Sequence, residues 1–258
     1  LKPQPGNPRP RVFRLLEDDA VINRMGFPSK GADFVVDKLT HLDVQSLKRA
    51  NGVLGLNIGK NKDTPIEEAA NDYIQLMKKF APLADYLTIN ISSPNTVGLR
   101  RLQGREMLED LLGRVNLERG TWNPPALRAG ASVKRPILVK IAPDLTDEEL
   151  DDAIGVILDK GMDGVIATNT TLAREGLRSR HRGESGGLSG SPLAFKSEAV
   201  LIRVVKLVDG RVPIVSVGGI MNPEDAKKRL AMGASLVQVY TGLVYRGPQL
   251  VREIVESL

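Results

Sequence analysis

The sequence predicts an α/β fold, a (β/α)8 TIM barrel whose first strands are missing from the chain. From residue 51 onward, short apolar runs alternate with amphipathic helical stretches, as parallel strands joined by helical crossovers require. Nearly every run ends in a polar residue, and only strands arranged in a ring direct all these side chains at one ligand. Six strands are found where a closed barrel needs eight, so we expect the missing two to precede Leu1. No second domain is indicated, so residues 1–258 are expected to form one incomplete barrel domain.

The six expected strands are compact apolar runs with little alternation of polar and apolar residues. This pattern is typical of parallel strands that are buried on both faces. An open dinucleotide-binding sheet is the alternative, but no strand is followed by the GxGxxG pattern that such a sheet uses. The expected strands are Val53–Ile58, Tyr86–Ile91, Ile137–Ile141, Gly164–Thr168, Pro213–Val217 and Leu236–Tyr240.

The helices between these strands have recognisable starts and ends. Thr64 and Thr146 each open a capping-box pattern, with a glutamate three residues later. Asn222-Pro223 predicts a third helix start, because proline is favoured at the first helical position. Glycines that suit helix ends follow three of the helical stretches, at Gly161, Gly210 and Gly233.

Composition excludes several kinds of chemistry. The chain has no cysteine, so it can form no disulfide, Cys-ligated zinc site or thiol nucleophile. His41 and His181 are its two histidines and neither belongs to an HExxH motif, so we expect no metal. The 36 Lys and Arg residues are interspersed with 31 Asp and Glu, which suits an anionic ligand and gives no case for nucleic acid. No apolar run reaches the roughly 18–20 residues of a membrane helix.

Four segments fall outside the strand–helix rhythm. Leu1–Pro10 is rich in proline and predicts an extended segment of a longer protein. Ser92–Gly104 and Thr170–Leu193 are long connections that follow strands, so we expect functional lids at the barrel mouth. Gly120–Arg135 follows a helix instead and is expected to be a surface insertion on the opposite face.

Two glycine-containing loops follow the last two strands. Gly218-Gly219 and Tyr240-Thr241-Gly242 each precede a predicted helix start. In barrels these loops often bind phosphate, because glycine lets backbone N–H groups approach the anion and the helix dipole favours its charge. The alternative is that the glycines only form tight turns.

Lys140 ends a strand whose other residues are apolar. A buried lysine without a partner is costly or loses its charge, so the side chain should point into the barrel mouth. It could form a Schiff base, act as a fixed cation beside an electron-rich ring, or belong to a structural ion pair.

Asparagines and serines gather at the same predicted mouth. Amides both donate and accept hydrogen bonds, so a set of them at successive strand ends suits a flat heterocycle such as a pyrimidine or a flavin. Ser92 or Ser93 could be a nucleophile, but no histidine forms a triad pattern with them. Ser93 could instead be a base in a dry pocket with a water relay. The asparagines are Asn23, Asn57, Asn90, Asn95 and Asn169.

Together these motifs resemble class 2 dihydroorotate dehydrogenase, in order and over essentially the whole chain. The resemblance implies oxidation of (S)-dihydroorotate to orotate, with FMN as the hydride acceptor and a quinone as the second oxidant. The matching motifs are Asn23–Phe27 (NRMGF), Gly55–Asn61 (GLNIGKN), Asn90–Gly98 (NISSPNTVG), Leu138–Asp144 (LVKIAPD), Thr168–Thr171 (TNTT), Gly186–Gly190 (GGLSG), Val217–Ile220 (VGGI) and Val239–Thr241 (VYT).

The resemblance also implies roles for individual residues. Ser93 would take the C5 proton of the substrate, where class 1 enzymes use a cysteine, and Thr96 and Phe27 would shape its water relay. Lys140 would stabilise negative charge on the reduced flavin. Substrate contacts are expected from Asn23, Arg24, Met25, Gly26, Phe27, Asn90, Ser93, Asn95, Asn169 and Thr170. FMN contacts are expected from Asn57, Asn90, Lys140, Thr168, Gly190, Gly218, Gly219, Tyr240 and Thr241.

The chain also departs from the family's pattern. It has no AAGFDK-like segment, which in the family brings flavin contacts and a substrate-binding lysine, and no helical pair that forms a quinone tunnel. We therefore expect membrane contact through a segment absent here. The Gly120–Arg135 insertion and the NPRPRVFRL opening favour the mitochondrial inner membrane over a bacterial cytoplasmic membrane. Two other hypotheses remain: a phosphate-binding barrel with a Schiff-base Lys140, and a truncated barrel fragment without catalytic activity.

Overall fold

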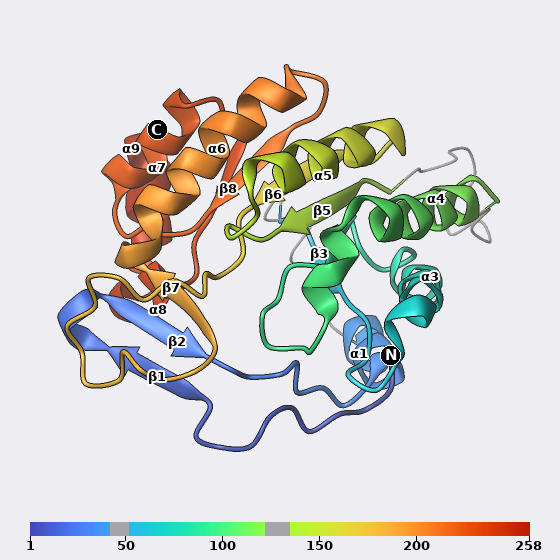
Figure 1. Cartoon of the computed structure of the whole chain (residues 1–258), viewed down its shortest axis with the longest axis horizontal. Coiled ribbons are helices and arrows are strands. Elements are labelled where there is room, and N and C mark those ends of the chain that lie inside the picture. Colours follow the sequence, from blue (N-terminus) through green and yellow to red (C-terminus); the bar gives the residue numbers. More distant parts are fainter. Residues whose placement is uncertain (42–51, 122–134) are drawn as a thin grey trace.

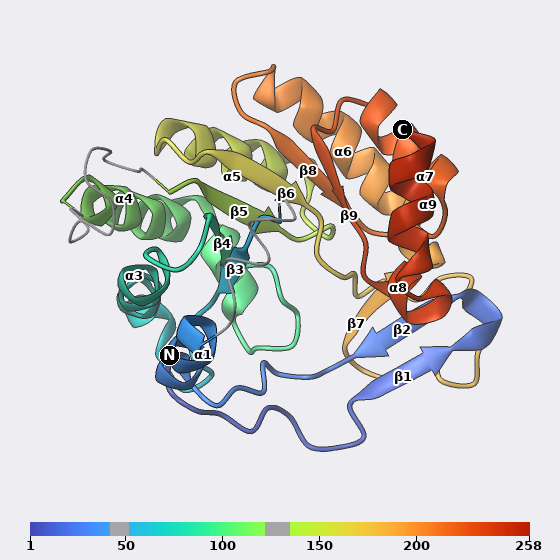
Figure 2. The same ribbon diagram turned by 180° about the vertical axis from the view of Figure 1, so that it is seen from behind.

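A computed structural model describes residues 1–41, 52–121 and 135–258 of the chain. Within these residues, six parallel strands form one curled sheet in the order β3-β4-β5-β6-β8-β9 (Figures 1 and 2). All six lie within the ranges that the sequence predicts. The first and last residues of each strand are at most two residues inside the expected ones. Their bounds are β3 Gly55–Ile58, β4 Tyr86–Asn90, β5 Ile137–Ile141, β6 Gly164–Ala167, β8 Ile214–Val217 and β9 Leu236–Gln238.

Helices cover the outer side of this sheet. α3 packs on β3 and β4, α6 on β6 and β8, and α7 on β9, and neighbouring helices from α3 to α6 lie side by side. The apolar residues between helices and sheet form the main core, with fully buried side chains such as Tyr73, Leu87 and Ile157. These helices are α3 Ala69–Phe80, α4 Arg105–Thr121, α5 Asp147–Asp159, α6 Ala194–Val208 and α7 Pro223–Ala231. Three more are α1 Ala32–His41, α8 Thr241–Arg246 and α9 Gln249–Ser257.

Two of the three predicted helix starts are confirmed. Thr146 and Glu149 form a reciprocal capping box at α5, and the Asn222 side chain accepts a hydrogen bond from Asp225 N at 2.8 Å at the start of α7. The predicted capping box at Thr64 is wrong. The first helical turn is a short 3-10 helix, Ile66–Glu68, whose N-cap is Pro65 with no side-chain cap, and the Thr64 hydroxyl donates to the Asp72 carboxylate at 2.8 Å.

The predicted helix-terminal glycines are confirmed. They follow α5, α6 and α7 and have left-handed φ angles of +67°, +71° and +105° at Gly161, Gly210 and Gly233. Such angles favour glycine because it has no Cβ.

A second, antiparallel sheet lies beside the carboxyl ends of the parallel strands, and the sequence analysis did not anticipate it (Figure 1). It contains β1 Val12–Leu15, β2 Ala20–Asn23 and β7 Gly187–Gly190, in the order β1-β2-β7. Phe13, Leu15 and Ile22 form a small core of their own with Leu177 and Leu188. The Thr170–Leu193 connection is therefore not simply a loop, because β7 fixes its last part to the β1–β2 hairpin.

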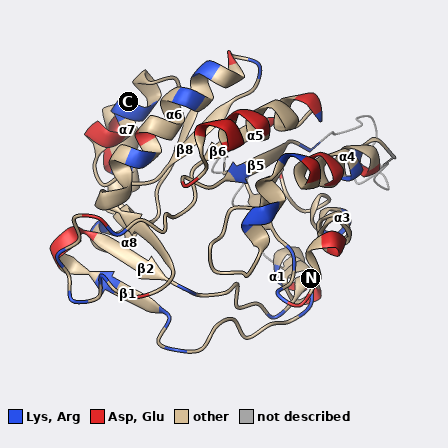
Figure 3. Ribbon diagram, viewed as in Figure 1, with Lys and Arg blue, Asp and Glu red and all other residues tan. Residues whose placement is uncertain are grey.

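The arrangement fits a TIM-barrel-like α/β fold. Within the described residues the sheet curls, but β3 and β9 each pair with one neighbour only. Charged residues of both signs are interspersed over the helices, as Figure 3 shows for one face. No helix in the described ranges combines the length and the apolar character needed to cross a bilayer. Most of the predicted Gly120–Arg135 insertion, residues 122–134, lies outside the described residues.

Candidate active site

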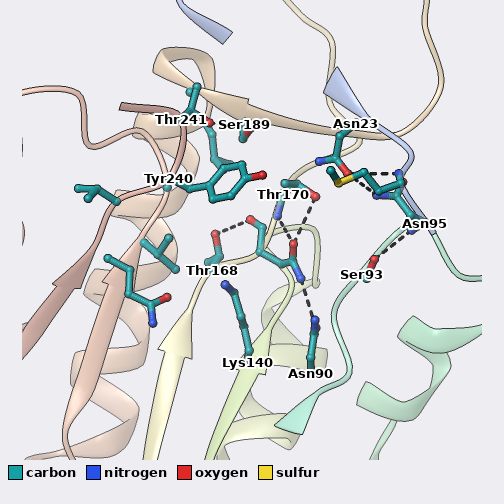
Figure 4. Close-up of a pocket in the computed structure, with 18 of the residues that line it drawn as sticks. Asn23, Asn90, Ser93, Asn95, Lys140, Thr168, Thr170, Ser189, Tyr240 and Thr241 are labelled. Atoms are coloured by element: carbon teal, nitrogen blue, oxygen red, sulfur yellow. Dashed lines mark hydrogen bonds between the residues drawn. The ribbon is translucent and has the colours of Figure 1, made fainter. Parts of the chain in front are cut away.

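A pocket of about 740 Å³ lies at the carboxyl ends of the parallel strands (Figure 4). Its volume is within the range of small-molecule and cofactor sites. The structure therefore confirms the expected convergence of the strand ends. The predicted site residues that line it are Asn23, Met25, Gly26, Phe27, Asn57, Asn90, Ser93, Asn95, Lys140, Thr168, Asn169, Thr170, Gly190, Gly218, Gly219, Tyr240 and Thr241.

Two predicted site residues do not line the pocket. Arg24 follows β2 with its side chain directed away, pairing with Glu184 at 2.7 Å and lying over the Phe13 ring at 4.6 Å. Successive side chains of an extended segment point to opposite sides and Asn23 occupies the inner one, so the structure places the Arg24 side chain outside the pocket and its role as a substrate contact stays a prediction. Thr96 is buried in the loop that carries Ser93 but does not reach the pocket surface.

Amides and hydroxyls at the ends of β4 and β6 form one hydrogen-bonded network. The Oδ1 atom of Asn90 accepts from Asn169 Nδ2 at 3.3 Å and from Ser92 Oγ at 3.1 Å. Asn169 Nδ2 also donates to Ser92 Oγ at 3.0 Å, and its Oδ1 accepts from Thr170 N at 2.7 Å. Since the Asn90 oxygen is occupied, its NH₂ group is left as a donor without a partner in the described part of the chain.

A second network joins the loop of Ser93 to the segment after β2. Asn95 Nδ2 donates to Asn23 Oδ1 at 3.1 Å. Asn7 donates from its amide to the Asn95 carbonyl at 3.3 Å and to the Arg24 carbonyl at 3.0 Å. Asn7 was not predicted, because it lies in the proline-rich opening where no strand-end signal exists.

Ser93 is 6% exposed and lines the pocket. Its Oγ atom accepts from Asn95 N at 3.3 Å, and among the described residues its own hydroxyl proton has no acceptor. The His181 ring lies tilted against Phe13 of the antiparallel sheet and His41 lies at the end of α1, and neither histidine lines the pocket. The geometry therefore gives no support to a Ser-His nucleophile.

Lys140 stands in register beside Asn90 on the neighbouring strand, and both point into the pocket (Figure 4). Burial lowers the pKa of Lys140 to about 8, since a charged amine is poorly solvated there. No carboxylate pairs with it among the residues that the structure describes, so it is not part of a structural ion pair there. An unpaired, partly charged amine at the pocket floor is available to a ligand.

The lowered pKa of Lys140 predicts a pH effect on the stability of the flavin-free protein. Between pH 8 and the ordinary value of 10.5, the unfolded chain binds more protons than the folded one, so the free energy of unfolding should rise with pH. Lys140→Met removes this contribution. The free energy of unfolding of the wild type, relative to that of the variant, should therefore rise by up to roughly 3 kcal/mol over this pH range. Urea denaturation of both proteins from pH 7 to 10.5 measures the difference. A difference that stays constant or falls with pH would contradict the assignment.

The glycines around the pocket are required by close backbone approach. Gly219 has φ +75°, and a Cβ there would lie 2.4 Å from Ala194 Cα. Gly190 has φ +98°, and its Cβ would lie 2.2 Å from the Asp19 carbonyl oxygen. Within the described residues, the backbone N–H of Gly219 has no acceptor. The Cβ clashes are with the protein's own backbone, as in tight turns, whereas the N–H of Gly219 is available to an anion.

A family model described as dihydroorotate dehydrogenase matches residues 1–258. The chain belongs to this family. It is 49% identical over 258 residues to "Dihydroorotate dehydrogenase (quinone)" of Akkermansia muciniphila, covering the whole chain and 71% of that relative. A relative of the same name from Xanthomonas campestris is 50% identical with the same coverage. The solved structure of DHODH from Eimeria tenella in complex with ferulenol has a TM-score of 0.90 and 43% identity, covering 100% of this chain and 71% of that one.

The relatives' names confirm the resemblance to class 2 dihydroorotate dehydrogenases, and FMN dependence is a property of this family. The curated relatives named above come from bacteria. They give no support to the mitochondrial inner membrane expected from the sequence.

The pocket of this dihydroorotate dehydrogenase family member includes residues that the sequence analysis missed. Ser189 enters from β7, and its Oγ accepts from Thr241 Oγ1 at 2.8 Å. Gln238 lines the pocket from the end of β9. Ser189 is found only once β7 is known, whereas Gln238 is a polar strand-end residue of the kind that identified the others.

Proposed function

We propose that this chain is the catalytic core of the oxidation of (S)-dihydroorotate to orotate in pyrimidine biosynthesis, with FMN and a quinone as successive oxidants. The single observation that carries the proposal is that Ser93, Lys140 and Asn169 line one pocket in a chain of the dihydroorotate dehydrogenase family. The three residues follow three different strands, and the stability of the fold does not require their polar side chains to lie at one pocket.

The donor set of the pocket fits FMN. Asn57, the free NH₂ of Asn90, Lys140 and Thr168 would hold the flavin ring, since an isoalloxazine presents both carbonyl and ring-nitrogen groups to such partners. The glycine-lined end would hold the phosphate, because the backbone N–H of Gly219 has no acceptor among the described residues and can donate to an anion. The residues at that end are Gly190, Gly218, Gly219, Tyr240 and Thr241. When bound, FMN supplies the acceptor for the hydride from C6 of the substrate and passes the electrons to the quinone.

Ser93 is the base that takes the C5 proton. Its buried position excludes bulk water, and the N–H of Asn95 donates to its oxygen, which stabilises negative charge that develops there. Thr96 and Phe27 would shape a water relay that carries the proton away. Phe27 has φ +51°, a rare backbone conformation for a bulky residue and one that concentrates at functional sites.

The substrate lies between the two amide networks. Asn23 and Asn95 would hold one edge of the pyrimidine, with Met25 and Gly26 against it, while Asn90, Asn169 and Thr170 would hold the other edge and the carboxylate. Amides at both edges match a ring that carries C=O and N–H groups in alternation. The assignment is supported by the hydrogen bonds that fix the amide orientation on each side.

Asn169→Ala should weaken orotate binding and leave FMN binding unchanged. Loss of one ring-edge partner leaves a buried polar group unsatisfied, which costs about 1–3 kcal/mol, or roughly 5- to 150-fold in affinity. Orotate titration followed by the flavin absorbance measures the effect. Asn116→Ala, an exposed asparagine on α4, serves as the control. A change confined to FMN affinity would mean that Asn169 belongs to the cofactor site.

The proposed activity is tested by steady-state turnover of the FMN-saturated protein with dihydroorotate and a quinone, using dichloroindophenol as the terminal acceptor. Dye reduction that depends on dihydroorotate is the expected result. The Schiff-base alternative predicts no such reduction and predicts trapping of Lys140 by borohydride with a carbonyl substrate. The lowered pKa of Lys140 suits either chemistry, and membership of the family favours the flavin.

Three broader proposals follow from the family. The described residues would form a single FMN-binding domain, and the six parallel strands would be part of an eight-stranded barrel, as the unpaired edges of β3 and β9 suggest. The protein would act at a bacterial cytoplasmic membrane, because quinones reside in membranes and the named curated relatives are bacterial. Vesicle co-sedimentation of the protein tests the last point.

A further inference from the structure

One carboxylate behind the pocket collects four hydrogen bonds from three different segments. Asp144 follows β5, and its Oδ1 accepts from Lys196 Nζ at 2.6 Å and from Thr171 Oγ1 at 2.5 Å. Its Oδ2 accepts from Arg100 Nη1 at 2.8 Å and from Leu172 N at 3.0 Å. The side chains of Arg100 and Asp144 are 21% and 19% exposed, and neither residue lines the pocket.

Arg100 uses its other two nitrogens on backbone carbonyls beside the pocket. Its Nε donates to the Ser92 carbonyl at 3.0 Å, and its Nη2 donates to the Thr170 carbonyl at 2.8 Å. Ser92 directly precedes Ser93, and Thr170 lines the pocket from the other side. A single guanidinium therefore connects the loop that carries the base, the segment that holds the substrate, and Asp144.

Only arginine can make this set of contacts. Its planar guanidinium presents five N–H donors in a fixed fork, whereas lysine is a single point of charge on a flexible stem. The carboxylate holds the fork in place. Burial alone would raise the pKa of Asp144, but hydrogen bonds from Lys196, Thr171 and Arg100 keep this pKa below its ordinary value. The carboxylate therefore stays ionised at neutral pH.

We propose that Arg100, anchored by Asp144, is a positioning residue for the oxidation: it fixes the Ser92–Gly104 loop against the Asn169–Thr171 segment, so that Ser93 faces the substrate. This inference rests on the proposed function, because it takes Ser93 as the base and Asn169 and Thr170 as substrate contacts. A displacement of about 1 Å between reacting groups can cost on the order of 100-fold in rate. Loss of Arg100 should therefore slow proton removal without altering the flavin site.

The test is the rate at which saturating dihydroorotate reduces FMN in a single anaerobic turnover. Arg100→Gln is expected to lower this rate about 100-fold, while orotate affinity, measured by titration, falls less than about tenfold and the flavin content stays that of wild type. Arg100→Lys should recover part of the rate, because it keeps the charge and one of the contacts. Arg203→Gln is the matched control, since Arg203 on α6 pairs with Asp147 and Asp151 on α5. Flavin in this variant should be reduced at the wild-type rate.

Asp144→Asn provides a second test of the role of Arg100 if Arg100→Gln does not fold. It leaves Arg100 in place but weakens its anchor, and should slow flavin reduction roughly tenfold. A rate within threefold of wild type in a folded Arg100 or Asp144 variant would overturn the inference. An equal loss of rate in Arg203→Gln would also overturn it, because the effect would then be one of general stability. If wild-type protein itself fails to reduce FMN with dihydroorotate, the proposed function fails instead, so the two outcomes are distinct.

Discussion

Replacing Ser93 with alanine is expected to slow reduction of bound FMN by dihydroorotate by about 10²–10⁴-fold, the usual contribution of a positioned general base. FMN should remain bound at wild-type affinity, because removing the Ser93 hydroxyl leaves Lys140 and Thr168, the residues proposed to contact the flavin ring, in the pocket. Anaerobic stopped-flow absorbance of the FMN-loaded protein measures the rate. Orotate should still perturb the flavin spectrum, which separates loss of the base from loss of substrate binding.

Ser93→Cys is the informative companion, because cysteine is the residue that the resemblance implies at this position in class 1 enzymes. A thiol is a stronger acid than a hydroxyl, so the variant should recover part of the lost rate and shift its pH dependence to lower values. Unchanged flavin reduction in Ser93→Ala would refute the role of this residue.

Lys140→Met is expected to produce the second large effect. It removes a cation that has no carboxylate partner in the described structure and replaces it with an apolar stem of similar length. Loss of a preorganised charge at a reacting centre typically costs about 10²–10³ in rate, so flavin reduction should slow by that factor, or FMN affinity should fall comparably. Fluorescence titration of FMN and stopped-flow reduction distinguish these results.

The control for this variant is Lys227→Met, at an exposed lysine on α7. It should bind FMN and be reduced as wild type is. Normal FMN affinity together with a normal rate of reduction in Lys140→Met would count against a role for Lys140 in the flavin site. The expected loss should also become smaller as the pH rises above 8, because the wild-type amine then gives up its charge in the free protein.

The parallel sheet was predictable from sequence because its strands are short, mostly apolar runs, and the inner strands β4, β5, β6 and β8 are buried over most of their length. The antiparallel strands β1, β2 and β7 gave no such signal. The pairing of β2 with β7 joins Ile22 to Leu188 across most of the chain, which local patterns do not reveal. The predicted capping box at Thr64 failed because the helical segment begins with a short 3-10 helix, Ile66–Glu68, whose N-cap is Pro65.

The candidate site was predictable where side chains stand at strand ends, as Asn90, Lys140 and Thr168 do. It was not predictable where loops supply the contacts. Asn7 lies in the proline-rich opening, and Arg100 acts through backbone carbonyls, for which no residue pattern exists. Arg24 lies outside the pocket because its motif includes alternate residues whose side chains point away from it.

The central claim is that one pocket holds dihydroorotate against FMN with Ser93 as the base. The most direct measurement is an anaerobic titration of the FMN-saturated protein with (S)-dihydroorotate, followed by visible absorbance. Wild type should lose the oxidised-flavin absorbance and release one orotate per flavin, whereas Ser93→Ala should keep the oxidised spectrum over the same time. Persistence of the oxidised spectrum in wild type, although orotate binds at the pocket, would contradict the central claim.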